Sequence, residues 1–146
     1  REVDIVTGCL LMIDADFWEK LGGFDPEFFM YGEEADLCMR AKAMGAIPTI
    51  TPEATVIHLE GGSTRGGVQR TKRTLAAVDG IVLRHFPRWQ RGPARRLLPV
   101  ATGLRAAGFG LACRVLGKKY RGQAEHWREV WRTRKSWQSS GFRRSG

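Results

Sequence analysis

Residues 23–40 of the chain read GFDPEFFMYGEEADLCMR, and they carry most of what the sequence says about fold and function. The stretch begins with a tight Asp-Pro turn, continues through an aromatic patch and a glycine, and ends in three carboxylates within four positions. Packed apolar surroundings raise the free energy of an ionised carboxylate and shift its pKa. The cluster is therefore a candidate chemical site at the start of a predicted helix.

A structural interpretation of the acidic cluster stands beside the chemical one. Acidic side chains are favoured in the first turn of any helix, where free backbone N–H groups and the helix dipole stabilise them. Asp36 and Arg40 are also spaced i,i+4, which suits an ion pair. Perturbed carboxylates mark functional sites only statistically, so local spacing leaves both interpretations open.

Length and hydropathy limit the kind of protein. The 146 residues suffice for one hydrophobic core, so we expect one domain or part of one. The most apolar segment, residues 97–116, is interrupted by Pro99 and two arginines, which argues against a membrane span. The chain opens on a charged Arg1-Glu2 pair without an initiator methionine, so we expect no signal peptide and a missing upstream portion.

The charge divides sharply along the chain. Residues 1–63 carry 4 Lys/Arg against 12 Asp/Glu, a balance of −8, whereas residues 64–146 carry 20 against 3, a balance of +17. An acidic half suits cation or hydroxyl chemistry, and a basic half suits phosphates, anionic lipid or nucleic acid. The two halves therefore have different expected partners.

The three cysteines, Cys9, Cys38 and Cys113, stand at wide spacings. An odd number so widely spaced fits neither a zinc pattern nor a disulfide framework. We therefore expect a reducing compartment and buried thiols that pack as small apolar side chains.

Strand-like patterns flank the acidic stretch. Residues 3–13 begin with alternation and become continuously apolar, as a strand does when it enters a core covered on both faces. Gly8 within this segment indicates either a bulge or a close approach by a ligand. Residues 49–51, bracketed by two prolines, and residues 54–58 are also predicted as strands.

Helical signals lie between and after these segments. Asp14 and Asp16 end the first apolar run, and an Asp-x-Asp pair there can hold a divalent cation. The FWEKLGG that follows predicts instead a short helix with an Asp cap and a glycine stop, which gives the aspartates a sufficient role. Helical spacing before Gly45 predicts a second helix of about 12 residues, and residues 68–86 predict a basic helix closed by proline.

The C-terminal region is basic and broken by prolines. Breaks are predicted at residues 84–89 and at Gly92-Pro93, before the apolar residues 97–116. Residues 120–137 are basic, with two tryptophans spaced i,i+4 on one helix face.

Several motifs occur in an order that resembles a known family. VTGCLLMI at residues 6–13, FWEKLGGFDPEFFMYGEEADLCMR at 17–40 and PEATVIHLEGGST at 52–64 follow one another as in the C-terminal half of the catalytic domain of family 2 inverting glycosyltransferases. Within that family, the sequence looks most like the bacterial rhamnosyltransferase-like branch. The resemblance covers about residues 3–86.

The resemblance implies an α/β fold, namely the C-terminal portion of a GT-A (Rossmann-like) sandwich, followed by basic amphipathic C-terminal helices. Residues 1–90 would be the acceptor-side half of the catalytic domain, 91–138 a basic helical extension, and 139–146 a disordered tail. The implied activity is inverting transfer of a hexose or rhamnose from a nucleotide-diphospho-sugar to a saccharide or lipid-linked acceptor, in bacterial polysaccharide biosynthesis.

The resemblance also implies roles for individual residues. Glu34 stands where the family has its catalytic base, which is usually Asp, and Glu33 would be its companion in the acceptor site. Asp36 would play a supporting part, as a structural partner of Arg40. The aromatic run offers flat apolar rings on which sugar faces stack. The expected acceptor-binding residues are Gly8, Phe29, Met30, Tyr31, Gly32, Glu33 and Asp36.

A divalent metal, Mg²⁺ or Mn²⁺, is the implied cofactor. Its main Asp-x-Asp ligands are expected in the missing N-terminal half, and His58 matches the histidine that completes the metal site in the family. Without the resemblance, a lone histidine at a strand end is more often structural. We expect the chain alone to be incomplete, so that it neither binds a nucleotide-sugar tightly nor turns it over.

The sequence of the basic region does not decide what this region binds. Residues 97–116 with their flanking cations fit an interfacial helix on an anionic membrane, or a solvated helix packed on its own domain. The expected location is the cytoplasm, with peripheral contact to the inner face of the cytoplasmic membrane. The alternative function is a basic module that binds nucleic acid or a membrane surface without catalysis. Nucleic acid is disfavoured because no recognised motif is present and the acidic half would repel it.

Overall fold

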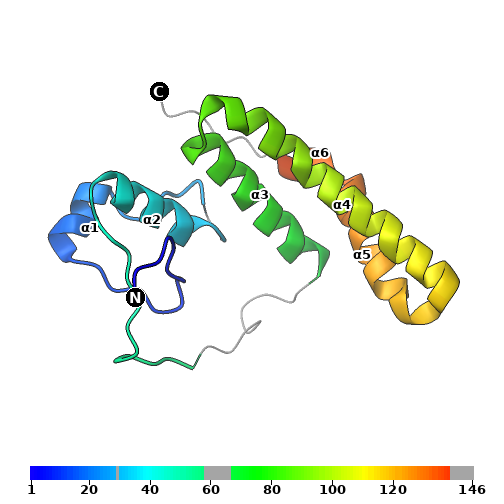
Figure 1. Ribbon diagram of the computed structural model, residues 1–146, viewed down its shortest axis with the longest axis horizontal. Coiled ribbons are helices and arrows are strands. Elements are labelled where there is room, and N and C mark those ends of the chain that lie inside the picture. The colour runs from blue at the N-terminus through cyan, green and yellow to red at the C-terminus, as the bar shows by residue number, and fades with distance from the viewer. Residues whose placement is uncertain (29, 58–66, 139–146) are drawn as a thin grey trace. The chain divides into compact units, whose positions relative to one another are not determined.

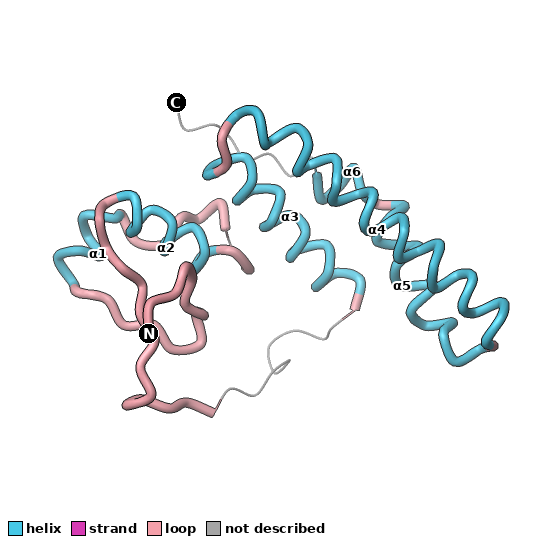
Figure 2. The backbone as a smooth tube through the Cα atoms, viewed as in Figure 1, coloured by secondary structure: helices cyan, strands magenta, loops and turns pink. Residues whose placement is uncertain are grey.

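The computed structural model describes residues 1–28, 30–57 and 67–138 (Figure 1). The chain divides into two compact units, Arg1–Gly62 and Ser63–Gly146. About 66% of the described residues are helical, and none of them forms a strand (Figure 2). The functional boundaries expected at residues 90 and 138 stay predictions, and the expected disordered tail at 139–146 lies outside the described residues.

The expected α/β sandwich is therefore wrong. The only pairing in the described residues is one antiparallel bridge between Glu2 and Thr49, where the Val3 N–H donates to the Pro48 carbonyl at 3.0 Å. Prolines lack the N–H that a ladder needs, so Pro48 and its neighbour at 52 confine pairing to a few residues. The apolar run at residues 3–13 is not covered on both faces, since Met12 is 93% exposed.

The first unit is built on two short helices whose ends follow local signals. Helix α1, Ala15–Leu21, begins where the Phe17 N–H donates to the Asp14 carboxylate at 2.9 Å. It ends at Gly22, whose φ of 76° suits the left-handed C-cap conformation. The expected cap and glycine stop are confirmed.

Helix α2, Glu33–Ala43, carries the buried face of the first unit. The Arg40 guanidinium pairs with Asp36 at 2.7 Å and donates to the Leu21 carbonyl at 2.6 Å and the Gly23 carbonyl at 2.8 Å. One side chain therefore ties α2 to the turn that ends α1. The predicted helix and the predicted Asp36–Arg40 pair are both confirmed.

The cysteines divide between interior and surface. All three are free, and Cys38 is buried on α2 as expected. Cys9 is exposed, which contradicts the expectation of a buried thiol. The reason is the same as for the missing sheet, because the apolar run that contains Cys9 lies at the surface.

The second unit is helical throughout its described part. It contains α3 (Val68–His85), α4 (Arg88–Leu116), a 3₁₀ turn η1 (Lys118–Tyr120), α5 (Arg121–Arg132) and α6 (Arg134–Gln138). In Figure 1 the short α5 and α6 follow the long α4 back along its length. The break at Phe86-Pro87 is confirmed, whereas the break expected at Gly92-Pro93 is wrong because α4 continues through both of its prolines.

A side chain from the end of the described chain supports the second proline of α4. Pro99 has no N–H, so the Arg95 carbonyl lacks its usual helical donor. The Gln138 side-chain amide donates to this carbonyl at 3.1 Å. The Arg95 guanidinium in turn donates to both Asp79 carboxylate oxygens, at 2.7 and 3.0 Å, and to the Gln138 carbonyl at 3.0 Å. These contacts join α3, α4 and α6.

The contact between α4 and α5 depends on a small residue. A Cβ placed at Gly103 of α4 would lie 2.7 Å from Nε1 of Trp131 on α5. A few residues along, the Arg105 guanidinium lies 5.1 Å from the ring centre of Trp127, in cation–π geometry. Two tryptophans of α5 thus lie against residues 103 and 105 of α4.

Gly103 and Gly108 provide a matched test of this contact. Gly108 lies in the same helix with nothing within 4 Å of an added Cβ. Gly108→Ala should raise the free energy of unfolding by about 0.5–1 kcal/mol, because alanine loses less backbone entropy in a helix. Gly103→Ala should be less stable than Gly108→Ala by about 1–3 kcal/mol, because the Trp131 ring must move. Urea unfolding followed by circular dichroism measures both, and equal stabilisation would contradict the packing.

Candidate active site

The candidate site is the N-terminal turn of α2. Gly32 is the N-cap, with φ of 90° and no side chain to accept from the free N–H groups. Glu33 and Glu34 are the first two helical residues, and both are half-buried. Carboxylates are favoured at this end of a helix by its dipole.

Both glutamates present an oxygen without a partner. Oε2 of Glu33 and Oε2 of Glu34 are buried, and neither accepts a hydrogen bond within the described parts of the chain. A buried polar atom left without a hydrogen bond typically costs about 1–3 kcal/mol, more if charged. This cost must be offset elsewhere in the fold, and such unsatisfied groups are a common feature of functional sites.

The pair is electrostatically coupled. Burial is the main cause that raises the pKa of the Glu33 carboxyl above its ordinary value of 4.5. The backbone N–H of Glu33 opposes this rise in pKa, and the neighbouring Glu34 carboxylate adds to it through charge repulsion and a shared hydrogen bond. Two adjacent carboxyls of this kind can hold one proton between them and can accept another from a hydroxyl group.

The backbone around the pair adopts an uncommon conformation. Tyr31 has a φ of 74°, the only positive value at a non-glycine residue among those described. A non-glycine residue in this region costs about 1–3 kcal/mol and is found preferentially at functional sites. A Cβ at Gly8 would lie 3.8 Å from the Glu34 Cβ, so the backbone at Gly8 passes close to the base of the Glu34 side chain.

The structure brings together most of the residues expected at the site. Gly8, Tyr31, Gly32 and Glu33 lie near Glu34, and the half-buried Met30 adjoins them in sequence. Phe29 lies outside the described residues. The Asp36 side chain is fully buried and paired with Arg40. The acceptor-binding roles of these residues stay predictions.

The described residues do not by themselves fit a divalent-metal centre. No group of three or more His, Cys, Asp or Glu side chains gathers anywhere in the described ranges. His58, the expected metal ligand, lies outside them. Asp14 serves as the cap of α1, which is the role that the sequence favours over metal binding.

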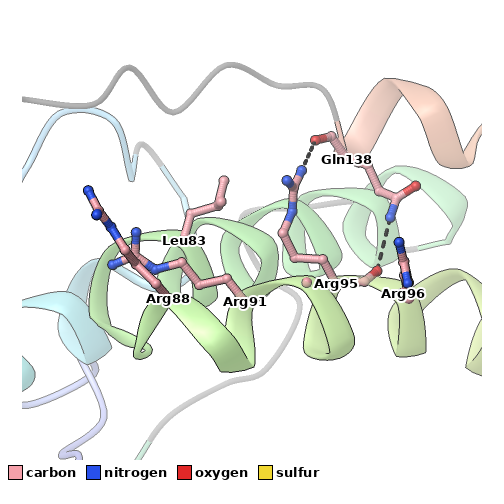
Figure 3. A pocket seen from close by; sticks show the side chains of 7 residues that line it. Leu83, Arg88, Arg91, Arg95, Arg96 and Gln138 are labelled. Carbon is pink, nitrogen blue, oxygen red and sulfur yellow. Dashed lines mark hydrogen bonds between the residues drawn. The ribbon is translucent and has the colours of Figure 1, made fainter.

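A second candidate site lies in the second unit and was not predicted from the sequence. A cavity of about 650 Å³ in the second unit is lined by Leu83, Arg88, Arg91, Gly92, Arg95, Arg96 and Gln138 (Figure 3). The sequence did contain a signal for this cavity, since the arginines at 88, 91 and 95 recur at the spacing of one helix face. The predicted break at Gly92-Pro93 concealed it by dividing these arginines between two segments.

Comparison with known proteins gives a partial match. Two curated proteins of Mycobacterium tuberculosis match the chain, from strains CDC 1551 / Oshkosh and ATCC 25618 / H37Rv. Both are N-acetylglucosaminyl-diphospho-decaprenol L-rhamnosyltransferases, and each is 34% identical over 64 residues, which is 44% of this chain and 21% of the relative. The chain thus covers about a fifth of the length of these relatives. No family model matches, and no solved structure matches significantly. The match supports a relationship to a glycosyltransferase family.

The raised pKa of Glu33 predicts a pH-dependent stability. Between 4.5 and the raised value the native state binds more protons than the unfolded chain, so stability is lost as the pH rises through this window. Glu33→Gln removes the titrating group. The free energy of unfolding of the variant, relative to that of wild type, should therefore increase as the pH is raised from about 4 to about 7.

Urea unfolding at both pH values measures this gain. Glu53→Gln is the matched control, because Glu53 is exposed and no hydrogen bond to its carboxylate is found in the described structure. An identical pH dependence in Glu33→Gln and wild type would contradict the coupling of the pair.

Proposed function

We propose that the chain is part of a sugar-transferring enzyme in which Glu34 is the general base for an acceptor hydroxyl. The observation that carries this proposal is the pair of buried carboxylate oxygens of Glu33 and Glu34, which lack partners within the described residues. The partial match to a rhamnosyltransferase supports the class of reaction. A nucleotide-diphospho-sugar is the proposed donor.

The chemistry needs one proton transfer and one displacement. The acceptor hydroxyl gives its proton to a Glu34 oxygen while the hydroxyl oxygen attacks the anomeric carbon of the donor. The bond from that carbon to the nucleotide diphosphate breaks, and the diphosphate leaves with the electron pair. Attack from the opposite face inverts the anomeric configuration.

The environment of the two glutamates favours Glu34 as the acceptor of the proton. Because the pKa of Glu33 is raised, Glu33 takes up the proton shared by the pair at a higher pH than an ordinary glutamate. Gly8 presents only backbone beside Glu34, so residue 8 has no side chain that could cover it.

An exposed apolar face of α4 supports the proposal of a lipid-linked acceptor. Five large apolar side chains are between 54% and 70% exposed and recur at spacings of three, four or seven residues, on one face of the helix. They are Leu97, Val100, Leu104, Leu111 and Val115. No helix in the described ranges has the length and hydropathy to cross a membrane. An exposed apolar face on a basic helix is instead typical of a helix lying in the membrane interface.

Charge selects an anionic bilayer as the occupant of this face. Residues 64–146 carry 20 Lys/Arg against 3 Asp/Glu, and Lys118 and Lys119 follow α4 directly. Each juxtamembrane Lys or Arg contributes about 1 kcal/mol of attraction to an anionic leaflet. We therefore propose that the second unit binds the cytoplasmic surface of a membrane, where a lipid-linked acceptor would be found.

Glu34→Gln tests the base. In the protein expressed from its complete gene, this variant should lower kcat for transfer of a labelled sugar by about 10²–10⁴, because the amide cannot accept the proton. Donor affinity, measured by calorimetry, should remain nearly unchanged. Glu53→Gln should behave as wild type. Retained turnover in Glu34→Gln would assign the base to Glu33 or Asp36 instead.

Flotation with lipid vesicles tests the membrane contact. The chain should float with vesicles that contain phosphatidylglycerol and much less with pure phosphatidylcholine. Leu104→Gln/Leu111→Gln should weaken partitioning at least about tenfold, since burying each leucine contributes about 1.5–3 kcal/mol. Ile47→Gln, at a 63% exposed residue of the first unit, is the control. Indifference to lipid charge would remove the membrane proposal.

A further inference from the structure

The arginine-lined cavity of the second unit is not used by the proposed reaction. Four of its seven lining residues are arginines, which project from successive turns of α4 (Figure 3). We call this group, Arg88, Arg91, Arg95 and Arg96, the arginine cluster. At about 650 Å³ the cavity falls within the usual size range of small-molecule sites.

Among the described residues, only one of these four arginines has an acidic partner. Arg95 forms its two-oxygen ion pair with Asp79, whose side chain is 3% exposed. Arg91 donates to the Phe86 carbonyl at 2.7 Å and to the Arg84 carbonyl at 3.5 Å, which uses its donors without cancelling its charge. Arg88 and Arg96 have neither an ion pair nor a side-chain hydrogen bond within the described residues.

An anion would relieve this imbalance. Like charges held close together repel, and a bound opposite charge favours the charged form of each. Asp79 is the only acidic residue that contacts the cluster in the described chain, and it is already paired, so the cavity contains no internal counter-ion for the remaining three. The charge of the cavity lining therefore favours negatively charged ligands.

The chemistry of guanidinium groups points to phosphate. A guanidinium offers five N–H donors in a planar fork that matches the oxygens of phosphate. A phosphate monoester carries about −1.5 to −2 charges near neutral pH, so a phosphate or diphosphate matches three uncompensated arginines better than a single carboxylate does. At about 30 Å³ per water molecule, the cavity has room for roughly twenty waters, more than a bare phosphate requires.

The cluster combines two arginine side chains that are held in place with two that are free to move. Arg95 is held by Asp79 and by the Gln138 carbonyl, and Arg91 is held by the turn between α3 and α4. Holding donors in place before binding reduces the entropy lost on binding. The side chains of Arg88 and Arg96, both exposed, are free to close on the ligand.

We propose that the arginine cluster is a binding site for a phosphate-bearing ligand, with diphosphate as the best match in charge and size. The ligand can be a free phosphate compound or the headgroup of a lipid, because both present the same oxygens. The site lies wholly in the second unit and is independent of the glutamate pair, so either proposal can fail without the other.

Calorimetry with inorganic pyrophosphate at fixed salt tests the site in the full chain. Arg88→Gln/Arg96→Gln should weaken the Kd at least about tenfold, because each charge-assisted contact contributes more than a neutral one. Arg70→Gln/Arg128→Gln is the matched control, since it removes the same charge from two exposed arginines outside the cavity. This control should stay within about twofold of wild type. Circular dichroism verifies that both variants fold.

Vesicles distinguish the two sources of phosphate. Binding to vesicles with phosphatidic acid that pyrophosphate reverses, and that the Arg88→Gln/Arg96→Gln variant loses, would identify a lipid headgroup as the ligand. Pyrophosphate binding that such vesicles do not affect would identify a soluble ligand, and either result supports the site. Absence of binding in both assays, or equal loss in the cavity variant and the control, would overturn it.

Discussion

Asp79 imposes the constraint on which the second unit depends. A buried carboxylate needs a paired cation and further hydrogen bonds, or the cost of removing its charge from water is not recovered. Arg95 supplies the cation and the hydrogen bonds through its ion pair with Asp79. The Arg95 guanidinium also donates to the backbone carbonyl of Gln138. The positions of α3, α4 and α6 therefore follow from satisfying one side chain. The same contacts hold one wall of the arginine-lined cavity in place.

The chain contains buried carboxylates of two contrasting kinds. Asp36 and Asp79 are almost fully buried, and each is paired with an arginine that also donates to backbone carbonyls. Glu33 and Glu34 have a buried oxygen each without such support in the described residues. Within one chain, the satisfied pairs show how this fold stabilises a carboxylate for structural purposes. The unsatisfied pair departs from that pattern, which supports a chemical role.

Local signals in the sequence predicted the helices because their causes are local. The Asp14 cap, the glycine at the end of α1 and Pro87 each act within a few residues. The strand predictions were wrong because a strand is stabilised by partners that are distant in the sequence. The alternation at residues 3–13 contains no information about whether those partners exist. The break predicted at Gly92-Pro93 was wrong because α4 continues through both of its prolines. One support for this helix is equally distant, since the amide that compensates Pro99 lies 39 positions further along, at Gln138. A sequence motif was enough to locate the candidate site. The arginine cluster could be recognised only once α4 was known to be one continuous helix.

The support of Pro99 by Gln138 also has a consequence during synthesis of the chain. The ribosome synthesises α4 before α6, so the Arg95 carbonyl has no donor until Gln138 is made, and the Arg95 guanidinium, which already has Asp79 as a partner, gains its backbone acceptor only then. An isolated helix with two internal prolines is a poor helix former in water. The nascent second unit should therefore stay loosely packed until residue 138 has emerged, and then consolidate in one cooperative step.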